Sequence, residues 1–385
     1  FIKGYKSPTT KERNNLSHLF LNYDLDLDLN NFSVSELYLS TEQVTNDTYL
    51  KVFDDHITKS NARPSKLNVM QSKAKLILNH NNFNLDTGFL AYESLGVEKN
   101  SDRYQFILPY YNFDTILDEN YLNGSISLSS SGSNNLKNTN NLRSSIVNDF
   151  NYDFNNLITN SGLNHDVNIQ FKNVNSLGKN DSNYKSSPQI ELMNLYQFTS
   201  KLPLQKSSDF HINYLTPKIS LKFNPSDMKN YSDTSRHVTV DNVFNFNRLG
   251  ISDSFEKGKS LTVGVDYKKQ KLNEINKYFE FKLATVFRDT EENFIPNSSS
   301  LNKKNSNLFG SIENKFSENF SLDYDFRIDN NYDRVEYNSI KADFKLNKFE
   351  TNFNYVEENG DAGDTNFLEN NTTYQINDSS YFTFS

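Results

Sequence analysis

Three aspartates in one short segment are the first candidates for chemistry in this sequence. Asp24, Asp26 and Asp28 alternate with leucines, and clustered carboxylates can bind calcium. An EF-hand calcium loop also needs a glycine at its sharp turn and a glutamate at its end, and neither is present here. On an extended strand the three carboxylates lie on one face, so we interpret them as a solvated strand face.

The other titratable residues form no catalytic or metal-binding motif. The six histidines are dispersed, without an HExxH motif or a His-x-His pair, and the chain has no cysteine. Neither a glycine-rich phosphate loop nor a G-x-S-x-G elbow occurs. We therefore expect a protein that is not an enzyme and that has no cofactor and no metal site. The net charge of −8 argues against nucleic acid as a partner.

The elements that position these residues are predicted by an alternation with a period of two. From Leu19 to Asn30, and again from Phe320 to Asp329, large apolar residues alternate with polar or charged ones. Segments of about ten residues with one apolar and one polar face are what a transmembrane β-barrel requires. Such runs predict about 18 strands. They lie at 18–30, 32–40, 66–79, 83–93, 103–113, 122–130, 145–156, 164–174, 188–201, 209–223, 259–268, 277–288, 306–316, 320–329, 335–346, 348–358, 366–376 and 380–385.

The composition fits this interpretation. Hydrophobic residues make up 35% of the 385 residues, which is low for a large globular core, but 14% are aromatic, which argues against disorder. No apolar run is long enough for a membrane helix, so a membrane crossing must use strands. The expected fold class is all-β, an antiparallel transmembrane β-barrel.

The lengths of the connections give the sheet two different ends. Long loops are expected at 41–65, 94–102, 131–144, 175–187, 224–258 and 289–305, and short turns at Asn31, His80–Asn82, Glu318, Asn347 and Asp378. Short periplasmic turns and long extracellular loops are typical of outer-membrane barrels. We therefore expect the outer membrane as the location.

Two prolines and one low-complexity segment interrupt the pattern. Pro217 and Pro109 lie inside alternating runs, where each removes a hydrogen-bond donor, so we expect a bulge or a break at each. Ser125–Ser145 is rich in Ser, Asn and Gly, and is expected to be a strand end followed by a mobile loop.

Two segments resemble a known family. The first runs from Leu215 to Tyr267 and contains Asp241, Asn242, Phe244, Asn247, Arg248, Asp253, Glu256, Gly258 and Gly264. The second is Glu42–Leu50, which resembles a Val-Ser-Asp-x-x-Tyr-Leu segment after an early strand. Both are similar to the C-terminal barrel of the LptD (OstA) family of lipopolysaccharide (LPS) assembly proteins, in its alphaproteobacterial form.

This resemblance implies a function and partners. It implies a barrel of roughly 26 strands that inserts LPS into the outer leaflet of the outer membrane. It also implies an LptE-like lipoprotein as a plug and a periplasmic Lpt bridge that delivers LPS through an N-terminal jellyroll. Residues 1–385 are expected to be part of the barrel domain, a fragment with neither jellyroll nor signal peptide. The alternative that the strands leave open is a general porin or a substrate-specific diffusion channel.

The longest expected loop, 224–258, contains the first of these segments. We predict that Asp241, Arg248, Asp253 and Glu256 form a charge-paired network that folds the loop into the lumen, together with Asn242 and Asn247. The competing interpretation is that these residues maintain the shape of the loop without contacting lipid.

Overall fold

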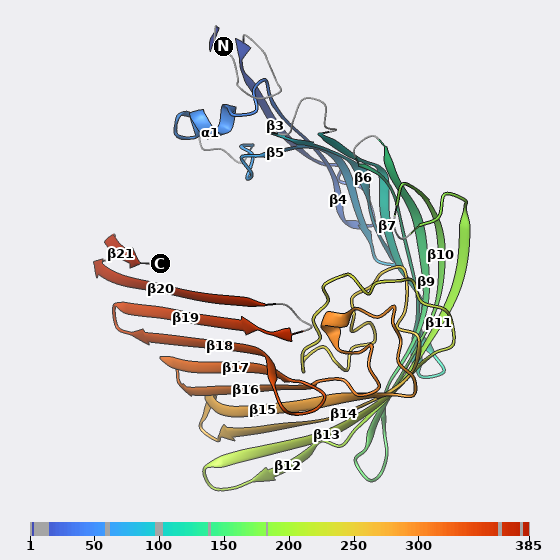
Figure 1. The fold of residues 1–385 in the computed structure, drawn as a ribbon, viewed down its shortest axis with the longest axis vertical. Helices are drawn as coiled ribbons and strands as arrows, with labels where there is room; N and C mark the ends of the chain where they lie inside the picture. The colour runs from blue at the N-terminus through green and yellow to red at the C-terminus, as the bar shows by residue number, and fades with distance from the viewer. Residues whose placement is uncertain are drawn as a thin grey trace. The chain divides into compact units, whose positions relative to one another are not determined.

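The computed structural model describes residues 2–3, 15–57, 62–96, 103–137, 140–181, 184–360, 364–377 and 380–384. Within them the chain is almost entirely β-structure (Figure 1). The strands are β1 (Ile2–Lys3), β2 (Asn15–Leu16), β3 (His18–Asp26), β4 (Phe32–Val44), β5 (Val69–His80), β6 (Phe83–Ser94), β7 (Tyr104–Tyr121), β8 (Gly124–Lys137), β9 (Asn141–Ile158), β10 (Asn164–Lys179), β11 (Gln189–Lys201), β12 (Leu204–Ser207), β13 (His211–Asn224), β14 (Gly258–Lys271), β15 (Glu274–Arg288), β16 (Leu308–Ser317), β17 (Phe320–Ile328), β18 (Val335–Leu346), β19 (Phe349–Glu358), β20 (Thr365–Asn377) and β21 (Ser380–Phe384).

Strands β3 to β21 form one sheet in which neighbours in the sequence are neighbours in space. The chain divides into two compact units, one of 1–121, 125–151 and 171–192, the other of 122–124, 152–170 and 193–385. Each predicted alternating run overlaps one of these strands, so the all-β antiparallel prediction is confirmed. The short strand β12 was not predicted.

The two prolines behave differently. At Pro109 the pairing of β6 with β7 shifts register between Gly88 and Leu90, so the expected bulge is present. At Pro217 the expected bulge or break is wrong, because β13 pairs with β14 without interruption or register shift. The carbonyl oxygen of Pro217 accepts the N–H of Leu202, which lies between β11 and β12. The proline nitrogen faces that same gap, so no bond to β14 is lost.

Two expected loops are also corrected. The prediction of a mobile loop at 131–144 is wrong, because β8 continues to Lys137 and β9 begins at Asn141. Backbone pairing with neighbouring strands tolerates the small polar side chains there. The long loop at 41–65 contains a short helix, α1 (Tyr49–Phe53), followed by a 3-10 turn (Asp54–His56). The predicted turn at Asp378 lies outside the described residues.

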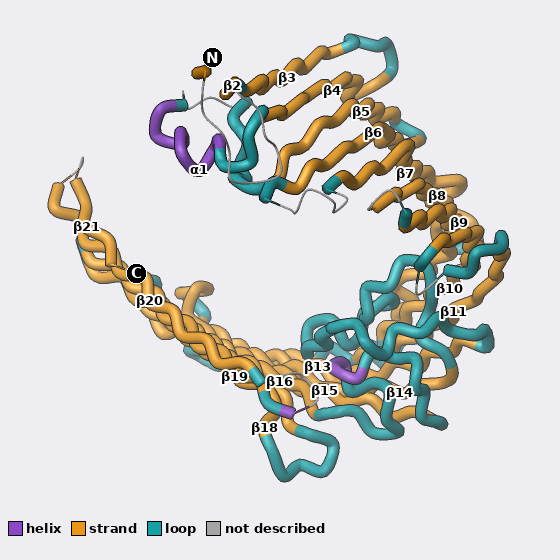
Figure 2. The backbone as a smooth tube through the Cα atoms, turned by 45° about the horizontal axis from the view of Figure 1, so that its top comes forward, coloured by secondary structure: helices purple, strands orange, loops and turns teal. Residues whose placement is uncertain are grey.

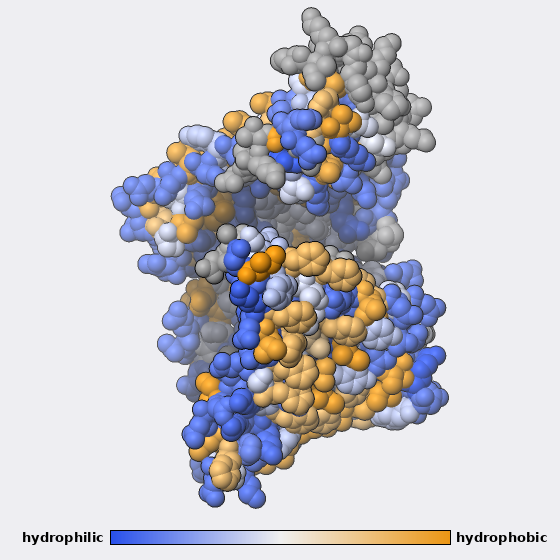
Figure 3. Space-filling view, turned by 90° about the vertical axis from the view of Figure 1, so that its left-hand side faces the viewer, coloured by the Kyte–Doolittle hydropathy of each residue, from blue (hydrophilic) through white to orange (hydrophobic). Residues whose placement is uncertain are grey.

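Within the second unit the longest loops lie on one side of the sheet. Residues 225–257 follow β13 and residues 289–307 follow β15, and both gather beside these strands (Figure 2). We call this loop-bearing side the inner face and the opposite side the outer face. In the lower half of Figure 3, which holds the strands of this unit, apolar side chains form a broad field bordered by polar ones. Among the described residues, no helix is both long enough and apolar enough to cross a membrane.

Candidate functional site

The two long loops are packed on the sheet through a hydrophobic core of their own. Val243, Leu249 and Ile251 of the first loop and Ile295 and Leu301 of the second are almost fully buried. They pack in one cluster with inner-face side chains of the strands, namely Ala284, Val286 and Phe309. Burial of each of the Val, Leu, Ile and Phe side chains contributes about 1.5–3 kcal/mol. The loops are therefore a folded layer on the inner face of the sheet.

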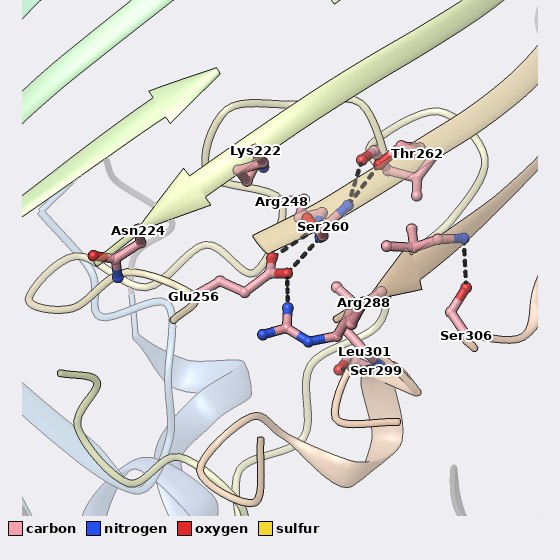
Figure 4. Close-up of polar contacts among 12 residues, drawn as sticks. Lys222, Asn224, Arg248, Glu256, Ser260, Thr262, Arg288, Ser299, Leu301 and Ser306 are labelled. Carbon is pink, nitrogen blue, oxygen red and sulfur yellow. Dashed lines mark hydrogen bonds and ion pairs between the residues drawn. The ribbon is translucent and has the colours of Figure 1, made fainter. Parts of the chain in front are cut away.

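Buried charges connect this layer to the strands (Figure 4). Lys222 on β13, Arg288 on β15 and the loop residues Arg248 and Glu256 are all less than 10% exposed. They converge because alternate residues of a strand share a face, and the inner face of β13 to β15 is covered by the loop. We call these four residues the latch.

Every donor of the Arg248 guanidinium has an acceptor from the protein. Its Nε lies 2.8 Å from one carboxylate oxygen of Glu256, and its Nη2 lies 2.5 Å from the other. The remaining contacts are to the Ser260 hydroxyl at 3.0 Å, the Thr262 hydroxyl at 2.9 Å and the Val243 carbonyl at 3.4 Å. A guanidinium has five N–H donors, so none is left for a lipid phosphate.

The other two cations of the latch complete the attachment. The Lys222 ammonium donates to the carbonyl oxygens of Asn245 and Phe246, each at 2.8 Å. Arg288 donates to the same Glu256 carboxylate that binds Arg248. Two guanidinium groups therefore share one carboxylate, and the side chains of Lys222 and Arg288 hold loop backbone directly.

The charge of Glu256 is strongly stabilised. Burial alone would raise the pKa of this carboxyl, but the guanidinium groups of Arg248 and Arg288 outweigh it and lower the pKa to about 2. Glu256 therefore stays ionised in any growth medium near neutrality.

The structure brings together only part of the predicted network. Arg248 and Glu256 meet, but Asp241 and Asp253 have other partners. Asp241 is exposed and lies 2.9 Å from the Lys282 ammonium of β15. Asp253 is buried, accepts from the Tyr231 hydroxyl, and lies 3.4 Å from the Lys229 ammonium.

The two predicted asparagines shape the loop locally. The side-chain oxygen of Asn242 accepts the N–H of Thr239 at 2.9 Å. Asn247 contacts Ile251 twice, donating to its carbonyl at 2.7 Å and accepting its N–H at 3.2 Å. Both side chains therefore close turns within residues 239–251.

Sequence reasoning missed the strand residues of the site. Lys222, Ser260, Thr262 and Arg288 all lie on the inner face next to the loop. The alternation gives their parity. Lys222 precedes the longest loop and Ser260 and Thr262 follow it, whereas Arg288 directly precedes the second long loop. That combination was the available signal for them.

A sequence model of the LptD family, described as LPS transport system D, matches residues 19–380. The chain belongs to the LptD family. No curated protein matches it. LptD-family proteins are outer-membrane β-barrels that transport LPS and insert it into the outer membrane, and they are not enzymes. The porin alternative is therefore set aside, and LPS is the substrate.

The second segment that resembles LptD, Glu42–Leu50, lies in the first unit and is also attached to the sheet by a buried ion pair. Asp47 is buried and binds the Arg103 guanidinium, whose Nε lies 3.2 Å from Glu93. Leu50 of α1 is 1% exposed and packs with Val44, Met70 and Leu95. We call the Asp47–Arg103 pair the clip.

Proposed function

We propose that residues 225–257 and 289–307 are an internal seal of this LptD-family conduit, held against the wall by the latch. LPS needs a passage wide enough for a glycan, and such a passage would also admit small toxic molecules. A folded layer on the inner face can narrow the passage without occupying the lipid route. The observation that carries this proposal is the complete use of the Arg248 donors by protein acceptors.

The remaining partners follow from the same family. We propose an LptE-like lipoprotein as a plug of the barrel and a periplasmic Lpt bridge, joined through a jellyroll, as the source of LPS. We also propose that the chain is of the alphaproteobacterial type, which the Asp241–Glu256 segment supports. Co-purification with an LptE-like lipoprotein tests the first of these proposals, and its failure from gently solubilised membranes would contradict it.

An Arg248→Ala strain tests the seal. The substitution leaves Glu256 and Arg288 buried beside a cavity, so the loop should detach while the strands persist. We expect increased entry of large antibiotics at normal or nearly normal surface LPS. The matched control is Arg334→Ala, because Arg334 forms a similar pair with Glu336 at 2.9 Å but its side chain is 55% exposed. Unchanged antibiotic exclusion together with unchanged surface LPS would overturn the seal.

The orientation of the sheet has its own test. We propose that the long loops face the cell exterior and the short turns the periplasm. Because residues 1–385 contain no cysteine, a single introduced one is a unique label within them, and cells with the unsubstituted chain give the background. A membrane-impermeant maleimide should label Asp233→Cys, in the first long loop, on intact cells. It should label Asn273→Cys, in the turn after β14, only after permeabilisation. The reverse pattern would invert the assignment.

A further inference from the structure

An apolar groove of about 580 Å³ lies on the strands of the second unit. Its side chains form two rows across the paired strands. In the first row Phe223 of β13 is opposite Lys259 of β14. In the second row Phe198, Leu221, Leu261 and Phe287 follow one another across β11, β13, β14 and β15. The two rows therefore span four neighbouring strands, and Val167 and Ile169 of β10 also line the groove.

The groove faces away from the loops. Lys222 and Arg288 point to the inner face and belong to the latch, so their sequence neighbours point to the outer face. Leu221 is 52% exposed, Phe287 40% and Phe223 39%, although these side chains are large and apolar. In an outer-membrane barrel this face contacts lipid. The groove thus opens on the face opposite the seal, although Lys222, Ser260 and Arg288 also contribute to its lining.

One cation stands at the edge of the groove. Lys259 is the second residue of β14 and is exposed, and its ammonium lies 5.6 Å from the centre of the Phe223 ring. Its stem can lie on apolar surface while its charge reaches the level of lipid headgroups. Asp289, also at the edge, accepts the backbone N–H of Lys259 at 3.4 Å and the Thr290 hydroxyl at 3.3 Å. The carboxylate is thus engaged by neighbouring donors.

We propose that this groove binds an LPS molecule that has already reached the outer leaflet, with an acyl chain along the second row and a lipid phosphate at Lys259. The proposal rests on the outward orientation of the long loops. The edge with Lys259 lies at the long-loop ends of the strands, and LPS is the lipid that this family delivers to the leaflet at that level. A cation above an aromatic and aliphatic surface matches a lipid whose phosphates lie directly above its acyl chains.

The absence of tryptophan from the chain permits a direct test. Leu221→Trp places one fluorophore in the groove. Tyr324→Trp places one on β17, at a similar distance from the long-loop end and outside the groove. The intact transporter, with its partners, is reconstituted in vesicles of brominated phosphatidylcholine, which quenches tryptophan in contact with its acyl chains. The fluorescence of the same transporter without an introduced tryptophan is subtracted, so that only the introduced residue is followed. LPS, dephosphorylated LPS or phosphatidylglycerol is then added.

If LPS fills the groove, it should protect the tryptophan at 221 from quenching at concentrations that leave the tryptophan at 324 quenched. Dephosphorylated LPS, or LPS on the Lys259→Gln background, should need about fivefold more lipid, since one lysine near a membrane surface contributes about 1 kcal/mol. Equal protection at both positions, or equal protection by phosphatidylglycerol, would overturn the proposal. Cysteine labelling decides the orientation separately, so the two failures are distinguishable.

Discussion

The clip and the latch both attach loops to the sheet through buried ion pairs, but they differ in the number of charged residues involved. In the first unit, Asp47 of the loop after β4 binds Arg103. In the second unit, one carboxylate, Glu256, serves two guanidiniums, and a third cation binds the backbone of the same loop. The clip depends on one buried pair. The latch is a network in which a single anion is shared by two of three buried cations.

This difference shows where each attachment is vulnerable. A buried charge is tolerated only while its partner is present, and breaking a buried pair costs more than the pair contributes. The clip should fail through either of its members. The latch should fail most severely through Glu256, because its removal leaves Lys222, Arg248 and Arg288 close together without a counter-charge.

Glu256→Gln should therefore have the largest effect on stability. We expect a loss of about 3–5 kcal/mol in the free energy of unfolding, the range for a buried charge left uncompensated. Denaturant unfolding of the folded barrel, followed by its heat-dependent migration on gels, measures this. A loss no greater than that of Asp47→Asn would remove the distinction between the two attachments.

Asp47→Asn should have a smaller and more local effect. Asparagine keeps the shape but loses the charge, and Arg103 keeps Glu93 at 3.2 Å. We expect about 1–3 kcal/mol for the weakened buried pair. Proteolysis near α1 should increase, while cleavage within 225–257 stays unchanged. Cleavage in both regions would indicate that the variant is unfolded throughout, in which case the clip is not a local attachment.

Acidification should detach the loop held by the latch only at low pH. Burial raises the pKa of Glu256, but the nearby charges of Arg248 and Arg288 lower it by more, from its usual 4.5 to about 2. Its stabilising contribution is therefore fully present above pH 4.5 and is lost as the pH falls toward 2. The label at Asp233→Cys can carry a fluorophore that reports loop release during acid titration. Release near pH 6 would contradict this assignment.

The smallest effect is expected at an exposed pair in the same loop. Lys257 lies 2.8 Å from Asp227, which lowers the pKa of Asp227 through that hydrogen bond, but both are open to solvent. Exposed pairs contribute little and are screened by salt. Asp227→Asn should leave the unfolding midpoint unchanged at moderate ionic strength. A measurable decrease in the unfolding midpoint of this variant would show that the latch extends to the surface.

The strands could be predicted from the sequence because their determinant is local. An alternation such as that of β3 or β17 reports the faces of a strand directly. The Ser-rich part of β8 was misread as a loop for the opposite reason. The order of residues 131–137 depends on a neighbouring strand, where the side-chain amide of Gln105 on β7 donates to Asn135, a residue distant in sequence.

The site was predicted in part. Arg248 and Glu256 are eight residues apart and within one loop, so a pairing between them was accessible to sequence reasoning. Asp241 was grouped with them by proximity in sequence, but β15 supplies Lys282 as a nearer partner. Lys222 and Arg288 join the latch only because β13, β14 and β15 are neighbours, and a single sequence does not report such a distance.

The attachment of loop backbone to Lys222 has a consequence for the order of assembly. Without the loop, Lys222 and Arg288 would be uncompensated charges on a wall that is entering a bilayer. Strands β13 to β15 and residues 225–257 should therefore mature as one insertion unit, in which the loop is already docked when these strands reach the membrane. A chain lacking residues 230–252 should accumulate in the periplasm as an assembly intermediate. On depletion of the intact protein, this accumulation should be detected earlier than the defect in LPS export.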